Sequence, residues 1–237
     1  MLLGIKSKKT VFLRHLLVAG IASALVFMVW SLNSTWSPNM RLWKSFGGAS
    51  LFLLWFTVFI GPMAKLWKPL KKFLSWRREV GIWFFVVAFV HGYLVIDGWA
   101  RWSVWGFLGY QYIAELDTYL RAEPGFGLAN LMGLLALIFA LILASTSFDR
   151  VVSYVGISSW KWLHTFSYVI FYIAVLHALY FAFIHFTPSP QRVLMGLPTN
   201  YPDNALRFYY LGAFLSVFVA QIAAFVKIVR KQRSAGR

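Results

Sequence analysis

The run VGIWFFVVAFVHGYLVID, residues 80–97, carries one histidine, His91, inside an otherwise apolar segment. The segment is close to the length that crosses a bilayer, since a transmembrane helix needs about 20 predominantly apolar residues. A second long apolar segment, residues 160–186, carries His164 and His177. An ionisable ring inside a bilayer is costly and usually has a functional role. These two segments therefore indicate both the class of fold and where function is to be sought.

The composition of the 237-residue chain agrees with this interpretation. It is 60% hydrophobic, 19% aromatic and only 13% charged, with a mean hydropathy of +0.67, which is far from a typical soluble domain. Backbone polar groups in lipid must be paired within their own segment, so each apolar stretch is expected to be a helix. We predict an all-α, polytopic membrane bundle of six transmembrane helices at residues 12–32, 46–64, 80–97, 127–148, 160–186 and 207–227.

The basic residues predict the orientation of the bundle. The net charge is +16, and 17 of the 23 lysines and arginines fall in the N-terminus, the second and fourth connections and the tail. By the positive-inside rule both termini are cytoplasmic. We expect a cytoplasmic basic N-terminus at 1–11, the six-helix domain at 12–227 with a retained first helix, and a cytoplasmic basic tail at 228–237. The positive charge favours contact with the lipid bilayer. We do not expect nucleic acid as a partner.

Two connections on the opposite side are long. Residues 97–126 hold several tryptophans and tyrosines followed by a polar run, so a short interfacial helix is expected there. Residues 187–206 contain four prolines and predict an ordered, irregular cap. Each connection is either a lid over the helix ends or a surface on which a partner docks.

The depths of His91 and His177 match. His91 lies 13 residues beyond Arg78 and His177 lies 16 beyond Lys161, which places both roughly 20 to 24 Å from their basic markers at about 1.5 Å of rise per residue. Odd-numbered helices run in the same direction, so the two rings can face each other. Two neutral imidazoles can supply both axial ligands of a b-type haem. The alternative for either ring is a hydrogen-bonded packing residue.

His164 is harder to place. It precedes His177 by 13 residues, so on an ideal helix the two rings differ by about 140° in azimuth. The two rings can serve haem only if the helix is irregular or if the haem planes are held from different sides. The segment of residues 80–97 has no second histidine at the level of His164. A ligand of a second haem, a propionate contact, a flavin contact and an interfacial residue all remain open for it.

Other polar residues near the ends of these segments have two interpretations each. Arg77 and Arg78 could pair with haem propionates or a flavin phosphate through charge-assisted hydrogen bonds, or they are ordinary positive-inside anchors. His15 and His185 are expected to be interfacial. The chain has no cysteine, which excludes disulfides, thiolate nucleophiles and iron–sulfur clusters. The spans also offer no nucleophile or acid–base pair, so we assign no catalytic residue.

A specific resemblance adds to these arguments. The run RREVGI at 77–82, Phe89-Val90-His91, WKWLH at 160–164 and Leu176-His177, after Thr146-Ser147, resemble the ferric-reductase-like transmembrane domain over residues 46–186. Within that family the chain is most similar to the MsrQ/YedZ group, the haem-binding membrane subunits of periplasmic methionine sulfoxide reductase systems.

The resemblance implies an electron-transfer subunit of an oxidoreductase system in the bacterial inner membrane. It would contain one or two haems b, with FMN as a further candidate cofactor. Electrons would pass from a cytoplasmic flavin reductase or the quinone pool to a periplasmic oxidoreductase subunit. His91 and His177 would be the axial ligands of the haem iron, and His164 would be tied to a second haem or to flavin. No fused flavin module is recognised, so a separate donor is expected.

Three alternatives remain. One is a membrane cytochrome that reduces ferric or other metal ions. Another, from a different class, is a haem-free proton-coupled transporter, which predicts further ionisable groups inside the spans; the second, fourth and sixth segments carry almost none in their interiors. The third is a haem-free membrane scaffold, for which the matched histidines would be a coincidence.

Overall fold

The computed structural model describes residues 8–114, 117–121, 125–186, 193 and 201–235. Within these residues the chain is almost entirely helical, with one short two-stranded sheet. In chain order the elements are α1 (Lys8–Leu32), α2 (Pro38–Leu66), the 3₁₀ helix η1 (Lys68–Trp76), α3 (Arg77–Val95), the π-helical turn η2 (Ile96–Ala100), α4 (Val104–Phe107), β1 (Tyr110–Ile113), β2 (Thr118–Arg121), α5 (Phe126–Ser145), α6 (Asp149–Val155), α7 (Ile157–Leu163), the 3₁₀ helix η4 (His164–Phe166), α8 (Ser167–Phe183) and α10 (Arg207–Ala235).

The predicted six-helix membrane bundle is confirmed. Six helical stretches are long and apolar enough to cross a membrane: Lys9–Leu32, Pro38–Leu66, Lys68–Ala100, Phe126–Ser145, Ile157–Phe183 and Arg207–Ala235. Each overlaps one predicted segment, although the second begins at Pro38 rather than at residue 46. Proline suits the first turn of a helix because the amide there has no intrahelical partner. The added turns of α2 contribute residues to the candidate site described below.

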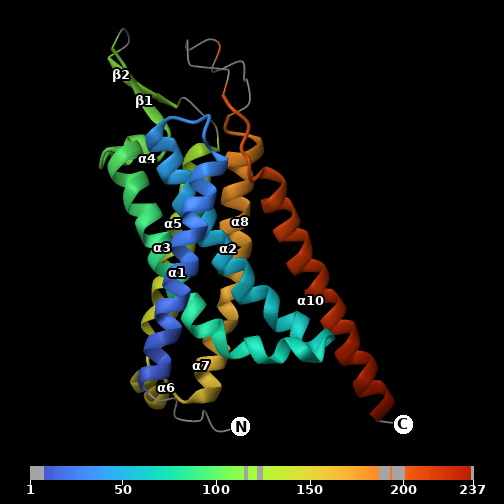
Figure 1. The fold of residues 1–237 in the computed structure, drawn as a ribbon. Helices are drawn as coiled ribbons and strands as arrows, with labels where there is room; N and C mark the ends of the chain where they lie inside the picture. The colour runs from blue at the N-terminus through green and yellow to red at the C-terminus, as the bar shows by residue number, and fades with distance from the viewer. Residues whose placement is uncertain (1–7, 115–116, 122–124, 187–192, 194–200, 236–237) are drawn as a thin grey trace.

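Helix α2 lies at the centre of the bundle. It packs against α1, α3, α8 and α10, while α5 packs against α3 and α8. The interior is made mostly of small and branched side chains, among them Ala49, Val58, Ile170 and Val217, together with a few aromatic ones such as Phe171. Small residues allow close approach of helices, which is what drives helix association in lipid. Helix α10 leans away from the other helices toward the C-terminus (Figure 1).

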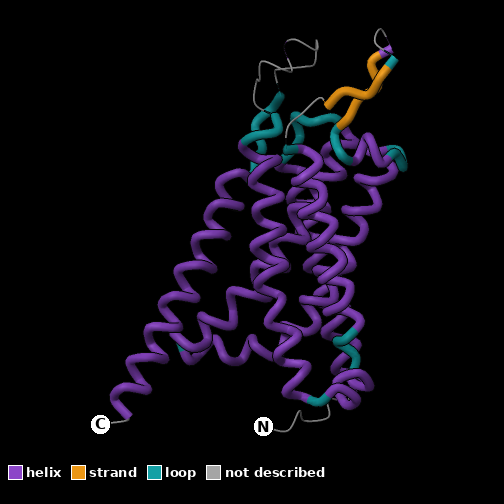
Figure 2. Tube along the Cα trace, turned by 180° about the vertical axis from the view of Figure 1, so that it is seen from behind, coloured by secondary structure: helices purple, strands orange, loops and turns teal. Residues whose placement is uncertain are grey.

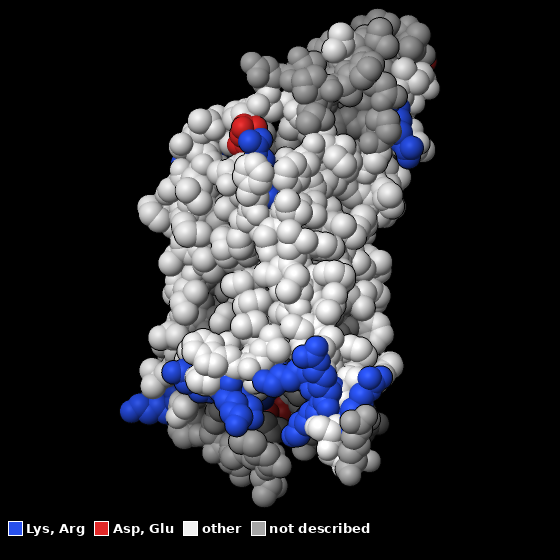
Figure 3. Space-filling model, turned by 90° about the vertical axis from the view of Figure 1, so that its right-hand side faces the viewer, with Lys and Arg blue, Asp and Glu red and all other residues white. Residues whose placement is uncertain are grey.

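The two ends of the bundle differ in charge and structure. Both termini lie at one end, which we call the basic end: it carries η1 and the lysines and arginines of residues 65–78 and 227–233 (Figures 1 and 3). The opposite end, the hairpin end, carries β1 and β2, which project beyond the helices (Figure 2). Between the two ends, the face in Figure 3 shows almost no charge. This distribution is the one expected of a protein embedded across a bilayer.

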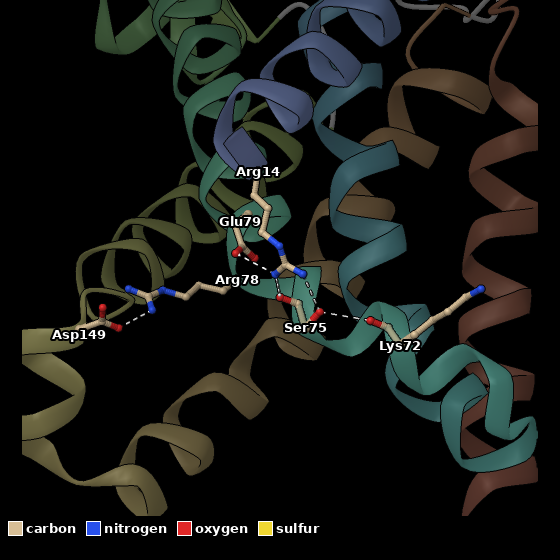
Figure 4. Close-up of polar contacts among 6 residues, drawn as sticks. All are labelled: Arg14, Lys72, Ser75, Arg78, Glu79 and Asp149. Atoms are coloured by element: carbon tan, nitrogen blue, oxygen red, sulfur yellow. Dashed lines mark hydrogen bonds and ion pairs between the residues drawn. The ribbon is translucent and has the colours of Figure 1, made fainter. Parts of the chain in front are cut away.

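A polar cluster joins α1 to α3 at the basic end (Figure 4). Arg14 Nη1 lies 3.2 Å from Glu79 Oε1, and its guanidinium also donates to the backbone oxygen and the hydroxyl of Ser75. Arg14 covers the ring of Trp76 at 4.2 Å. Because the Glu79 side chain is 4% exposed, this contact fixes the first helix against the third one in an apolar environment.

The connection at 97–126 differs from the prediction. A short helix is present, α4, in which Ser103 Oγ accepts a hydrogen bond from the amide of Gly106 at 3.1 Å. Our sequence analysis missed the antiparallel hairpin that follows, in which Tyr110 pairs with Arg121. In the hairpin the Tyr112 hydroxyl donates to the Asp117 carboxylate, and this bond raises the pKa of Tyr112. The proline-rich connection at 187–206 lies largely outside the described residues.

Candidate functional site

His91 on α3 and His177 on α8 lie beside each other inside the bundle. Their ring centroids are 6.4 Å apart and their planes meet at 76°. The structure thus brings together the two histidines whose depths match in the sequence. Both are far from the basic end along their helices, at the level of the beginning of α2.

Each ring is held in the same way by a neighbouring helix. The Nδ1 atom of His91 lies 3.0 Å from the backbone oxygen of Trp43 on α2. That of His177 lies 2.7 Å from the backbone oxygen of Ala129 on α5. A backbone oxygen can only accept, so each Nδ1 carries the proton. The Nε2 atom of each ring is therefore the unprotonated nitrogen, which is the form that ligates a metal.

Two glycines make this approach possible. A Cβ atom on Gly47 would stand 2.9 Å from Cε1 of His91, and one on Gly133 would stand 3.0 Å from Cε1 of His177. Each glycine follows the accepting carbonyl residue, Trp43 or Ala129, by four positions, and in an α-helix that residue stands over the carbonyl. The missing side chain is what allows each ring to reach its carbonyl.

The separation of the rings fits one metal ion held between them. A metal–imidazole bond is about 2.0 Å long and the ligating nitrogen lies about 1.2 Å from the ring centroid, so imidazoles on opposite sides of one metal have centroids roughly 6.4 Å apart. The observed distance is 6.4 Å. The distance between the two rings is therefore the distance that one shared metal ion would require.

A cavity of about 210 Å³ surrounds the two rings. Its lining is mostly apolar and comes from α2, α3, α5 and α8, with additional residues from the hairpin end such as Trp99. Large apolar cavities with a few convergent polar groups are typical of cofactor sites. Asn130, which is buried and lines the cavity, is already engaged, since its Nδ2 donates to the backbone oxygen of Phe107 at 2.8 Å.

The other three predicted site residues lie elsewhere. His164 belongs to η4, a short 3₁₀ helix between α7 and α8, so the helix is irregular between His164 and His177. Its ring centroid lies 4.2 Å from that of Trp160, with the two planes tilted by 35°, and its Nε2 lies 3.5 Å from Thr146 Oγ1. Arg77 donates through Nε to the backbone oxygen of Thr57 at 2.8 Å, and Arg78 pairs at 2.5 Å with Asp149.

None of these three residues lines the cavity around His91 and His177. The side chain of Arg78 is 37% exposed and that of its partner Asp149 is 86% exposed, so this pair lies at the surface of the basic end (Figure 4). His164 and the two arginines thus mark a second polar region, separate from the paired histidines.

The structure corrects the sequence analysis at His185 and adds residues that it missed. His185 was expected to be interfacial, but it is 3% exposed and lines the cavity among aromatic rings. The irregular end of α8 turns it inward, which periodicity alone does not indicate. Lys44 also lines the cavity, although the sequence shows it only as a basic residue of the outer side. Nothing in the sequence around Gly47 and Gly133 indicates that they contact the two histidine rings.

These features define a class: a membrane-spanning helical bundle with two facing imidazoles in an interior cavity. A family model described as the ferric reductase like transmembrane component matches residues 46–175. The match covers α3, α5, most of α2 and the first half of α8; it includes His91 and ends two residues before His177. The chain belongs to this family, as its sequence resemblance suggested.

Two curated relatives place the chain more closely. It is 28% identical over 179 residues to the protein-methionine-sulfoxide reductase heme-binding subunit MsrQ of Pectobacterium carotovorum subsp. carotovorum (strain PC1), covering 73% of this chain and 80% of that protein. It is 30% identical over 154 residues to the MsrQ of Cronobacter sakazakii (strain ATCC BAA-894), covering 64% and 67% respectively. No solved structure matches the chain.

Proposed function

We propose that this protein binds haem b between His91 and His177 and passes electrons across the bacterial inner membrane. The observation that carries the proposal is the ring pair: centroids 6.4 Å apart, with each Nδ1 committed to a backbone oxygen. This leaves both Nε2 atoms as ligands of the iron. The two curated relatives are named as heme-binding subunits, which supports the same cofactor here.

The residues of the chain have separate roles in this proposal. The hydrogen bonds to Trp43 and Ala129 fix the tautomer and direction of each imidazole and increase its basicity as a ligand. The apolar lining excludes water and lowers the dielectric, which tunes the reduction potential. When bound, haem supplies the one-electron redox chemistry. No protein side chain has to form or break a bond.

The orientation of the chain in the membrane follows from the charge of its two ends. The positive-inside rule places the basic end, with both termini, in the cytoplasm and the hairpin end in the periplasm. The paired histidines lie toward the hairpin end, so the proposed haem is the one that delivers electrons to a periplasmic oxidoreductase subunit. We propose a methionine sulfoxide reductase catalytic subunit as this acceptor, because the two relatives are named as heme-binding subunits of a protein-methionine-sulfoxide reductase.

Electrons would enter at the basic end from a cytoplasmic flavin reductase or from the quinone pool. We propose that His164, Arg77 and Arg78 serve this entry by holding a second cofactor, either haem or FMN. The close contact of the His164 ring with that of Trp160, with centroids 4.2 Å apart, supports a built site rather than a free surface histidine. Haem content per chain decides between the two cofactors: loss of one of two haems in His164→Ala identifies a second haem.

A reduced-minus-oxidised optical spectrum of the purified protein, with haem measured per chain, tests the main proposal. A six-coordinate b-type spectrum is expected, and it should be lost in both His91→Ala and His177→Ala. His15→Ala is the matched control, because His15 is a half-buried residue of α1 that does not line the cavity. A folded, haem-supplied protein without haem would refute the proposal and favour the transporter or scaffold alternatives.

A further inference from the structure

Lys44 on α2 places an ammonium group at the cavity of the paired histidines. It lies next to Trp43, whose carbonyl holds His91, and three residues before Gly47, which touches the ring of His91. Three residues correspond to about 4.5 Å of rise along a helix. Lys44 therefore lies within one turn of α2 from Gly47, the residue that contacts the ring of His91, and on the side toward the hairpin end.

No carboxylate of the described residues lies within ion-pair distance of Lys44; the nearby Asp203 pairs with Arg207. The Nζ atom of Lys44 lies over the ring of Trp36 at 3.9 Å and over that of Phe186 at 4.9 Å. Among the described residues that line the cavity there is no aspartate or glutamate. Aromatic faces offset part of the cost of removing an ammonium from water, but an opposite charge is the usual partner.

Haem carries two propionate carboxylates, and these anions, like the Lys44 cation, lack an opposite charge in an apolar cavity. A carboxylate buried without a cation is costly, and a lysine ammonium is a strong partner for it. Arg77, the first residue of α3, is 14 residues from His91, which is about 21 Å along the helix. Arg77 and Arg78 do not line this cavity, whereas Lys44 does.

We propose that Lys44 binds a propionate carboxylate of the haem held by His91 and His177. The haem would therefore be seated with its carboxylate edge toward the hairpin end of the bundle. This inference rests on the proposed function, because it presumes haem between the two histidines. It differs from the expectation drawn from the sequence, in which Arg77 and Arg78 receive the propionates.

The test compares two cofactors as well as two side chains. Haem-depleted protein is reconstituted with haemin or with haemin dimethyl ester, whose propionates are esterified and uncharged. In the unsubstituted protein the ester should dissociate at least about tenfold faster than haemin, as expected for loss of one partner of a buried charge pair. Transfer of the bound cofactor to apomyoglobin measures this rate, and the comparison needs no substitution that could impair folding.

Lys44→Met should accelerate haemin dissociation at least about tenfold and lower the midpoint potential, since an unpaired carboxylate near the iron favours the ferric state. Lys44→Arg should preserve both properties. The effect of Lys44→Met should vanish with the ester, as in a double-mutant cycle. Arg41→Met is the control: it removes a cation from the same helix, but Arg41 donates to the carbonyl of Trp30 and does not line the cavity.

The possible failures of the two proposals are distinguishable. An unsubstituted protein that binds no haem refutes the proposed function before any variant is made. Haem binding with an unchanged rate and potential in Lys44→Met overturns the inference alone. An equal effect of Lys44→Met on haemin and on its ester also overturns it, because the lysine would then act on packing and not on a carboxylate.

Discussion

Replacing Gly47 or Gly133 by alanine tests the geometry of the paired histidines most directly. The added Cβ on Gly47 would stand 2.9 Å from Cε1, 3.1 Å from Nδ1 and 3.3 Å from Nε2 of His91. On Gly133 the corresponding distances to His177 are 3.0, 3.0 and 3.5 Å. Carbon atoms in contact are separated by about 3.5 to 4.0 Å, so the ring of His91 would have to move by roughly 0.6 Å or more and that of His177 by roughly 0.5 Å or more.

The size of the effect follows from three contributions. Adding a methyl group to a packed interior costs about 1 to 3 kcal/mol. Alanine in place of glycine inside a helix returns about 0.5 to 1 kcal/mol. The ring displacement also weakens the Nδ1 hydrogen bonds, which measure 3.0 Å for His91 and 2.7 Å for His177. We therefore expect a net loss of about 0 to 2.5 kcal/mol in unfolding free energy. Haem binding should weaken roughly tenfold, which corresponds to about 1.4 kcal/mol.

Haem content per chain and the rate of haem transfer to apomyoglobin measure this effect. Gly20→Ala on α1 and Gly212→Ala on α10 are matched controls, because a Cβ at either position meets nothing within 4 Å. Both controls should keep full haem content and gain slightly in thermal stability. Full haem content with an unchanged spectrum and transfer rate in Gly47→Ala would refute the reasoning that the glycine provides space for the His91 ring.

Two further predictions concern the basic end and the orientation of the chain. Arg14→Gln removes the guanidinium from the buried Glu79 and should lower the unfolding free energy by about 3 kcal/mol. Arg78→Gln breaks a surface pair and should lower it by less than about 1 kcal/mol. Equal shifts of the two variants in thermal unfolding in detergent would contradict this difference. The chain has no cysteine, so single cysteines report topology: in intact cells a membrane-impermeant thiol reagent should label Tyr112→Cys on the hairpin but label Tyr154→Cys only after lysis. The reverse pattern would invert the proposed orientation.

The sequence predicted the membrane bundle because the hydropathy of a segment is the sum over its own residues. A stretch of apolar residues partitions into lipid whichever neighbours it later packs against, so six spans could be located without knowing the fold. Depth is also a property of one segment, since each helical residue adds about 1.5 Å. For this reason the equal depths of His91 and His177 were visible in the residue numbers alone.

The sequence was less informative where the backbone leaves regular geometry. The hairpin of β1 and β2 was missed because its strands are only four residues long and lie among aromatic residues that also suit an interfacial helix. The 3₁₀ break at His164 and the turn that buries His185 depend on packing of α8 against its neighbours. Periodicity assumes a continuous helix and cannot show such breaks.

The sequence alone determined that this protein spans a membrane six times, that two of its histidines lie at one depth, and that one side is basic. Only the tertiary structure decided which way those histidines turn, that Gly47 and Gly133 admit them to backbone carbonyls, and that Lys44 shares their cavity while Arg77 does not. The physical reason is that depth belongs to one helix, whereas azimuth and neighbours are set by packing between helices.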